Sequence, residues 1–548
     1  MASPSPSRTP SRARRRAHTP TRGKHDVTGT VGQASWASSV INLLNTIVGA
    51  GVLAMPLAMS HMGIVLGIIV ILWAGLTAAF GLYLQTRCAA YLERGSSSFF
   101  ALSQITYPNA AIIFDAAIAI KCFGVGISYL IIIGDLMPGV VLGFTGEEGL
   151  ARFLLDRHFW VTAFMLVCIP LSYLRRLDSL KYTSVVALIS ISYLVVLVVY
   201  HFCAQDTLPD NQYPTPLRIF TWASPVAALS SLPVIVFAYT CHQNMFSVLN
   251  EISDNSHFRT TSVVSVSIGT AAAIYLLVAI TGYLSFGNEV GGNIVAQYAP
   301  SVSATIGRAA IVVLVMFSYP LQVHPCRASV DAVLKWRPSP SLKHKLSRSS
   351  TPSSNSLTVP DGSPPRDTPL LPTGKKRNSE ISETRFAIIT TVIIILSYIV
   401  AMTVDSLEAV LAYVGSTGST SISFILPGLF YYKISSPDNP LHQKLCKEED
   451  DYDVDFDPAT EDDEGRRHRS SSDDAVDRQH HEEGQGLLSS SGFLANSGFL
   501  SLGGRSLLRR TRHVRRKMLR KLALALSIYG LVVMVTCLAM NTFFIARH

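Results

Sequence analysis

Eleven stretches of about 20 mostly apolar residues limit the fold of this chain more than any other feature. A helix needs about 20 apolar residues to cross the hydrocarbon core of a bilayer. The chain has 548 residues, of which 48% are hydrophobic and only 15% charged, which is unusual for a soluble domain. We predict an all-α polytopic membrane protein with eleven transmembrane helices. They lie near residues 36–59, 63–85, 111–140, 158–174, 182–203, 223–247, 261–286, 304–326, 385–404, 407–432 and 521–545.

The charges predict an orientation. The 46 Lys and Arg exceed the 37 Asp and Glu, but they gather in tails and loops, so no nucleic-acid-binding face is predicted. With the N-terminus in the cytosol, most loop cations fall on the cytosolic side and few on the other. The cytosolic ones are Arg87, Arg94, Arg175, Arg176, Lys181, Arg259, Arg327, Lys335, Arg337, Arg385 and Lys433. The positive-inside rule then favours a cytosolic N-terminus and a C-terminus on the opposite side.

Three polar segments flank or interrupt the spans. Residues 1–33 are basic, 337–383 are rich in Ser, Pro and Lys, and 434–515 contain a long acidic run. Such compositions bury too little apolar surface to fold, so we predict cytosolic disorder in all three. The organisation is then a tail (1–33), spans one to eight (34–336), a linker (337–383), spans nine and ten (384–433), an acidic insert (434–515) and the last span (516–548).

Two of the spans contain residues that weaken a helix. The first contains Asn45 to Gly51 and then Pro56; its two closely spaced glycines let the backbone unwind. The sixth contains Pro225, Pro233 and the polar string 238–244. Unwound backbone at bilayer depth is tolerated only where it lines a cavity, because lipid cannot bond the freed N–H and C=O groups. Two broken helices therefore predict a binding site.

The spacing of the two broken spans predicts a transporter. They are five spans apart, and an odd number of crossings makes spans six to ten enter from the opposite face, as inverted repeats do. Paired broken helices at matching positions of inverted halves point to a site at the bilayer midplane. Half-helix N-termini suit a carboxylate, and half-helix C-termini suit an ammonium or a metal cation. A zwitterionic amino acid matches both.

Four ordered motifs carry a family resemblance. They are residues 45–56 (NTIVGAGVLAMP), 237–242 (FAYTCH), 282–287 (GYLSFG) and 414–418 (VGSTG) followed by Pro427. Together they resemble the amino acid/auxin permease family, and within it the fungal vacuolar amino acid transporters. The resemblance implies a leucine-transporter-type fold, with a five-plus-five inverted repeat and one extra C-terminal helix. It also implies L-amino acid transport driven by an ion gradient, usually of protons in vacuolar members, without a cofactor.

The resemblance also implies a site. The backbone of the first break would hold the amino acid head group, and the second break would face it. In sodium-coupled relatives a cation lies between the first and eighth spans. In the eighth span here, Ser318 and Tyr319 carry the only hydroxyls next to Pro320. We therefore favour protons as the coupling ion and keep sodium as the alternative. Tyr129, on the third span, can line the pocket or simply pack between helices. The substrate candidates are Asn45, Thr46, Ile47, Val48, Gly49, Ala50, Gly51, Phe237, Ala238, Tyr239, Thr240 and Tyr129.

Ionisable residues inside spans are costly and therefore suggest function. Lys121 on the third span can give up its proton near neutral pH if it is removed from water, or it can cap unwound carbonyls. His242 lies where the second broken helix should resume, and Asp135 lies near the outer end of its helix. With Ser318, these three are the candidates for ion coupling. His61 and His324 lie near span ends and are expected at the membrane interface.

The polar segments suggest partners and a rival function. Glu483, Leu487 and Leu488 have the acidic-dileucine spacing that adaptor proteins read, and the serine-rich tracts are possible kinase substrates. A transporter of the vacuolar membrane is the favoured interpretation. An amino-acid-sensing receptor that signals through the cytosolic inserts is the alternative. An enzyme or a metal site is not predicted, because no nucleophile, base and acid recur together and no metal-ligand spacing occurs.

Overall fold

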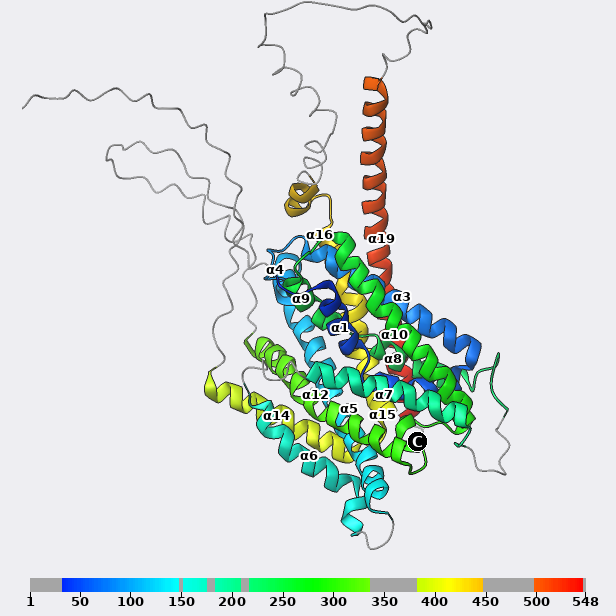
Figure 1. Cartoon of the computed structure of the whole chain (residues 1–548). Coiled ribbons are helices and arrows are strands. Elements are labelled where there is room, and N and C mark those ends of the chain that lie inside the picture. The colour runs from blue at the N-terminus through cyan, green and yellow to red at the C-terminus, as the bar shows by residue number, and fades with distance from the viewer. Residues whose placement is uncertain are drawn as a thin grey trace, which may run out of the picture.

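The computed structural model describes residues 32–146, 151–174, 183–207, 216–335, 382–446 and 497–545. These parts form one bundle of helices (Figure 1), and the only pairing of strand type among them is a bridge between Ala34 and Ile252. Almost all of the tail 1–33 and the linker 337–383 lies outside the described residues. The sorting candidates Glu483, Leu487 and Leu488 lie outside them too.

The helices follow the predicted apolar stretches closely. In chain order they are α1 (Trp36–Ile47), η1 (Ala50–Ala54), α2 (Met55–Met62), α3 (Ile64–Ala89), α4 (Phe99–Thr106), η2 (Pro108–Ala110), α5 (Ala111–Thr145), η3 (Arg152–Leu155), α6 (Arg157–Ser172), α7 (Thr183–Ala204), α8 (Pro225–Ala238), α9 (His242–Glu251), α10 (His257–Phe286), η5 (Gly287–Glu289), α11 (Ile294–Gln297), α12 (Val302–Lys335), α14 (Glu383–Thr403), α15 (Leu407–Val414), the π-helical turns η6 (Gly415–Ser419) and η7 (Ser421–Ile425), α16 (Leu426–Ile434) and α19 (Ser497–Ile545).

The described helices support nine or ten membrane spans. Nine are long and apolar enough to cross a bilayer, and a tenth appears if α1 and the segment Ala50–Met62 form one bent span. The remaining predicted span, near 158–174, corresponds to α6. Its 16 residues rise about 24 Å, less than the roughly 30 Å of a typical hydrocarbon core. The chain is thus an all-α polytopic membrane protein, and the count of eleven stays a prediction.

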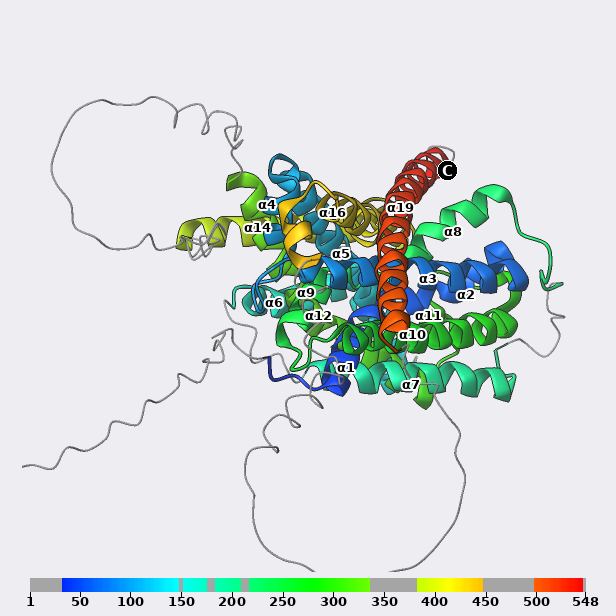
Figure 2. The ribbon, with the colours of Figure 1, turned by 90° about the horizontal axis from the view of Figure 1, so that it is seen from above.

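The outer faces of the helices are apolar, as contact with lipid requires. On α3, Ile69, Leu72, Trp73 and Leu76 are all about half exposed or more. A contiguous apolar face of this kind marks a surface that water does not cover. Figure 2 shows α3 and α19 crossing near one another at the outside of the bundle.

Buried charges tie α6, α12 and α14 together at one end. The Arg327 guanidinium donates to the carbonyl of Ser172 at 3.1 Å and to the hydroxyl of Thr390 at 3.0 Å. Asp331, also buried, pairs with Arg385 at 2.6 Å. Buried charges persist only when they are paired or hydrogen-bonded in this way. These three helices therefore form a braced unit beside the broken helices.

Helical residues extend into both ends of the acidic insert 434–515. Residues 440–446 are helical, and His442 there lies 2.8 Å from the Tyr91 hydroxyl. At the other end, α19 begins at Ser497 and extends past the bundle (Figure 1). The physical reason is that a helix already formed in a span propagates at low cost into neighbouring residues, whatever their charge.

Candidate functional site

The first predicted break is present. α1 ends at Ile47, and Val48 (φ −82°, ψ 100°) leaves the helical region. Gly49 follows with φ −147° and ψ −138°, and the chain turns helical again at Ala50. The two halves are bent by 49° relative to one another. The helix-weakening residues of this span thus break its hydrogen-bond ladder where predicted.

The second predicted break is also present, but it does not bend the span sharply. α8 ends at Ala238, and α9 begins at His242, the residue at which the sequence placed the resumption. Between them, Tyr239 and Cys241 lie outside the helical region. The two helices still form one candidate span, Pro225–Glu251.

A single side chain from α10 joins the two breaks. The Tyr275 hydroxyl lies 2.7 Å from the carbonyl oxygen of Ile47 and 2.8 Å from that of Ala238, the last residues of α1 and α8. Both carbonyls belong to helix ends, where the ladder leaves acceptors without an intrahelical donor. Lipid offers no replacement, so this fully buried phenol supplies the donor that both ends need.

The sequence analysis missed Tyr275. It stands alone in an apolar stretch, and most tyrosines in such a position only pack between helices. The one available signal was general: a phenol inside a span needs a hydrogen-bond partner, and the freed carbonyls of a broken helix need a donor.

The breaks also touch each other through backbone. A Cβ added to Gly51 would lie 2.6 Å from the Cβ of Ala238, so only glycine permits this approach. The ring of Tyr239 packs against that of Tyr275, with centroids 5.1 Å apart. On the α9 side, the amide of Asn244 donates to the hydroxyl of Thr46 at 3.0 Å. The two interrupted helices therefore form one packed unit.

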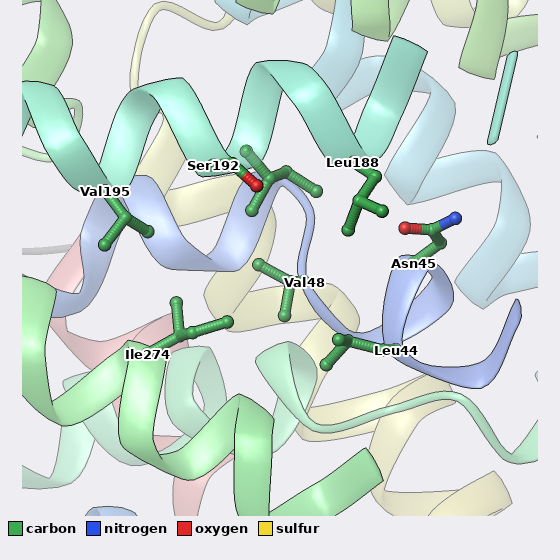
Figure 3. Close-up of a pocket in the computed structure, with 8 residues that line it drawn as sticks. Leu44, Asn45, Val48, Leu188, Ser192, Val195 and Ile274 are labelled. Atoms are coloured by element: carbon green, nitrogen blue, oxygen red, sulfur yellow. The ribbon is translucent and has the colours of Figure 1, made fainter. Parts of the chain in front are cut away.

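Two cavities lie beside the first break and share Asn45, Val48 and Ile191. The larger, of about 230 Å³, lies between α1, α7 and α10 and is mainly aliphatic (Figure 3). The smaller, of about 50 Å³, reaches the unwound backbone and lies between α1, η1, α5, α7 and α12. The smaller is lined by Asn45, Val48, Gly49, Ala50, Val52, Leu53, Tyr129, Ala187, Ile191, Leu194, Ile311, Leu314, Val315 and Ser318.

The smaller cavity brings together part of the predicted site. It collects four residues of the first break (Asn45, Val48, Gly49 and Ala50) with Tyr129 and Ser318 from two other spans. The remaining candidates line neither cavity; they are Thr46, Ile47, Gly51, Phe237, Ala238, Tyr239 and Thr240. These residues instead form the packed contact between the breaks and their neighbours. The second break therefore packs against the first break and does not line either cavity.

A polar cluster lies next to the second break, on the side that faces α3 and η7. The Nε2 atom of His242 is 3.1 Å from the carbonyl oxygen of Ala78 on α3, so this nitrogen is placed to donate. The Thr240 hydroxyl lies 3.2 Å from that of Ser423 in η7. Both His242 and Thr240 are buried. This cluster connects the second break to α3 and to the π-helical part of the tenth predicted span.

Lys121 lies in the same region. It is 4% exposed, and its Cβ would be 2.8 Å from a Cβ added to Gly418 in η6, so α5 and η6 are in direct contact. Consecutive π-helical turns are rare and occur often at functional sites. Lys121 and His242 thus belong to one buried polar region on the far side of the second break.

The other two ion-coupling candidates lie elsewhere. Ser318 lines the smaller cavity, and its hydroxyl donates to the carbonyl of Leu314 at 2.8 Å. Asp135 lies on α5, ten residues before its end at Thr145, near the ion pair of Arg157 with Asp405, which follows the end of α14. Among the described residues, no three His, Cys, Asp or Glu side chains gather to hold a metal ion. The four candidates therefore occupy three separate places.

Enlarging Gly51 should abolish function by separating the breaks. In Gly51→Val, the added atoms would overlap Ala238, so we expect transport to fall to background in vesicles that contain normal amounts of protein. Gly269→Ala, on α10, is the matched control because nothing lies within 4 Å of an added Cβ there. Normal transport by Gly51→Val would show that this close approach is dispensable.

The fold and the site define a class: a polytopic helical membrane protein with interrupted spans beside an internal cavity. The chain belongs to the transmembrane amino acid transporter protein family, whose model matches residues 32–449. It is 42% identical to vacuolar amino acid transporter 5 of Schizosaccharomyces pombe over 426 residues, which cover 76% of this chain and 90% of that protein. It is 40% identical to vacuolar amino acid transporter 6 of Saccharomyces cerevisiae over 443 residues, covering 76% and 94%. The crystal structure of MhsT in complex with L-phenylalanine matches with a TM-score of 0.47 and 14% identity, covering 74% and 90%. The predicted family is therefore confirmed.

Proposed function

We propose that this protein is a secondary active transporter that moves L-amino acids across the vacuolar membrane by alternating access. The observation that carries the proposal is the pair of interrupted helices held together by Tyr275 beside a cavity. Two relatives at about 40% identity, both named vacuolar amino acid transporters, support the substrate class and the membrane. The contact between the breaks supports alternating access, in which they would move as one unit against the brace of α6, α12 and α14.

The substrate head group binds at the first break in this proposal. The C-terminal carbonyls of α1 suit the ammonium group, and the N–H groups that begin the second half suit the carboxylate. Tyr129 and Ser318 face the same small cavity and complete its polar lining. The larger aliphatic cavity between α1, α7 and α10 gives the first half-helix room to move.

Protons are the proposed coupling ion, with Lys121 and His242 as the groups that bind them. A buried lysine and a buried histidine behind the second break can pass changes of charge to that break directly. Ser318, on the eighth predicted span in the small cavity beside the first, is where a sodium ion would lie if sodium were used instead. Asp135 stays a fourth candidate, near the Arg157–Asp405 ion pair.

The proposed topology has eleven spans, with α6 as the short fourth, and follows the leucine-transporter-type plan. Spans one to five and six to ten are inverted halves, and α19 is the extra helix. The N-terminus is cytosolic and the C-terminus lumenal. The linker 337–383 and the insert 434–515 then face the cytosol, where adaptors and kinases reach Glu483, Leu487, Leu488 and the serine-rich tracts.

Transport by vacuolar-membrane vesicles tests the proposal. Each of the twenty labelled amino acids is offered with and without a pH gradient, and with sodium replaced by another cation. We expect at least one to accumulate only when the pH gradient is present. Uptake that is indifferent to both gradients would contradict coupled transport.

Uptake by the same vesicles distinguishes a transporter from a receptor. A receptor binds amino acid with little flux and signals through its cytosolic insert. Removing residues 451–480, which lie outside the described residues and exclude the sorting candidates, should leave uptake unchanged in a transporter. Loss of a cytosolic response with no measurable flux in the full chain would favour the receptor instead.

A further inference from the structure

A histidine and a carboxylate meet at the end of the bundle away from the N-terminus of α1. The Nδ1 atom of His61, on α2, lies 3.8 Å from the Oε1 atom of Glu408, in the first turn of α15. The same Nδ1 atom lies 2.7 Å from the hydroxyl of Ser231 on α8. The side chains of His61 and Glu408 are 24% and 27% exposed. The sequence placed His61 at the membrane interface; the structure places it between three helices.

The surroundings of His61 contain a second charge. Arg218 precedes α8, and its guanidinium donates to the carbonyl of Ser60 at 3.2 Å and to the side-chain oxygen of Asn288 at 2.9 Å. Its charge acts on His61. Among the described residues, Glu408 from α15 and Arg218 are the charged groups set against this imidazole, and Ser231 is the polar group that α8 contributes.

Along η1 and α2, His61 lies between the smaller cavity and that end of the protein. Leu53 lines the smaller cavity, and eight residues further along a helix correspond to about 12 Å. The segment before α11 lies close to both α15 and α2. An added Cβ on Gly292 would lie 3.6 Å from Glu408 and 3.9 Å from Leu57. A closer ion pair between α2 and α15 at this point would narrow the approach to the first break from that end.

We propose that His61 and Glu408 form a proton-binding pair that closes the lumenal end of the transporter, tying α2 to α15 when His61 takes up a proton. This inference rests on the proposed function and its orientation. A neutral His61 can accept a hydrogen bond from Ser231 at Nδ1; a protonated one has a donor at both ring nitrogens. The Nδ1 donor then favours the carboxylate, and an approach of about 1 Å makes a charge-assisted hydrogen bond.

Proton uptake depends on Glu408. Arg218 repels a charged imidazole, and the carboxylate offsets that repulsion. Burial and the Arg218 charge both disfavour a charged imidazole, so the pair takes up a proton from an acidic lumen and releases it in a neutral compartment. Partial burial also screens the pair less than a surface ion pair. An acidic lumen thereby favours the conformation that is closed toward the lumen.

Cysteine accessibility tests the pair without relying on transport. In a Cys203→Ser background, which removes the exposed native thiol near this end, Leu57→Cys is treated from the lumenal side with an impermeant thiol reagent. Its labelling rate is divided by that of Ala151→Cys, an exposed position at the same end, at each lumenal pH. We expect the ratio to fall by about tenfold between roughly pH 7.5 and 5.5. In His61→Gln and in Glu408→Gln the ratio should not change with pH.

Two further variants complete the test. Exchanging the partners, His61→Glu with Glu408→His, should restore the pH dependence. His324→Gln removes a half-buried histidine toward the other end of the protein, on α12, and should keep the wild-type profile. An unchanged pH profile in His61→Gln would overturn the pair, whether or not the protein transports. Failure of all amino acid uptake, with the accessibility switch intact, would overturn the proposed function alone.

Discussion

Tyr275→Phe should lower kcat/KM for amino acid transport by about tenfold to a hundredfold. The substitution removes one oxygen and leaves the carbonyls of Ile47 and Ala238 without the donor that now serves them. A buried acceptor that loses its partner costs about 1–3 kcal/mol, and about 1.4 kcal/mol is a factor of ten. The cost falls on the geometry of the breaks, because these two carbonyls are the ones at which α1 and α8 end. Initial uptake rates over a range of substrate concentrations measure the effect.

Tyr319→Phe is the control for Tyr275→Phe. Tyr319 is equally buried, and its hydroxyl bonds to that of Ser397 at 2.6 Å, within the brace of α12 and α14. Ser397 keeps a second partner, the carbonyl of Ile394 at 3.0 Å. This control should lose some thermal stability and keep its kinetic constants. If both variants lose only stability, Tyr275 is a packing residue and does not position the breaks.

The chemistry of one phenol between two carbonyls suggests how the breaks respond to substrate. A tyrosine hydroxyl carries one proton, so it serves the two acceptors by sharing or by alternating between them. An ammonium group bound at the end of α1 would satisfy the Ile47 carbonyl and release Tyr275 to Ala238. Substrate at the first break would thus change the hydrogen bonding of the second. The Tyr275 hydroxyl bonds to both breaks, which makes such coupling direct.

The positions of the breaks could be predicted from the sequence because they depend on local backbone chemistry. Gly49 and Gly51 allow unwinding, and His242 marks the place where a polar string gives way to a new helix. Apolar length alone likewise located the helices. Both kinds of signal are carried by a few consecutive residues and need no knowledge of neighbouring helices.

The partners of each residue could not be predicted, because they depend on how each helix is rotated. Hydropathy that is nearly uniform around a helix gives no indication of which face meets which neighbour. Tyr275 and the pairing of His61 with Glu408 both follow from that rotation. So does the separation of Tyr129, which faces the cavity, from Phe237, which does not. Contacts between distant spans had to come from the structure.

Lys121→Met should uncouple transport from the proton gradient. Methionine keeps most of the side-chain volume against η6 and removes the charge from the polar cluster behind the second break. We expect gradient-driven accumulation to fall by about tenfold or more, while exchange of labelled for unlabelled amino acid at equal pH continues. The two assays on the same vesicles separate the driving force from substrate binding, which the cavity residues on the other side of the breaks should still provide.

The matched control is Lys335→Met, at the end of α12. Lys335 pairs with Asp331 at 2.8 Å and is about one-third exposed. Asp331 is buried but keeps its pairing with Arg385 when Lys335 is replaced, so both assays should stay near wild type. If Lys121→Met lowers accumulation and exchange equally, the lysine only supports the structure, and His242 becomes the first residue to examine for coupling. A selective loss of accumulation would instead place the coupling site behind the second break, where η6 and α5 meet, and not in the substrate cavity.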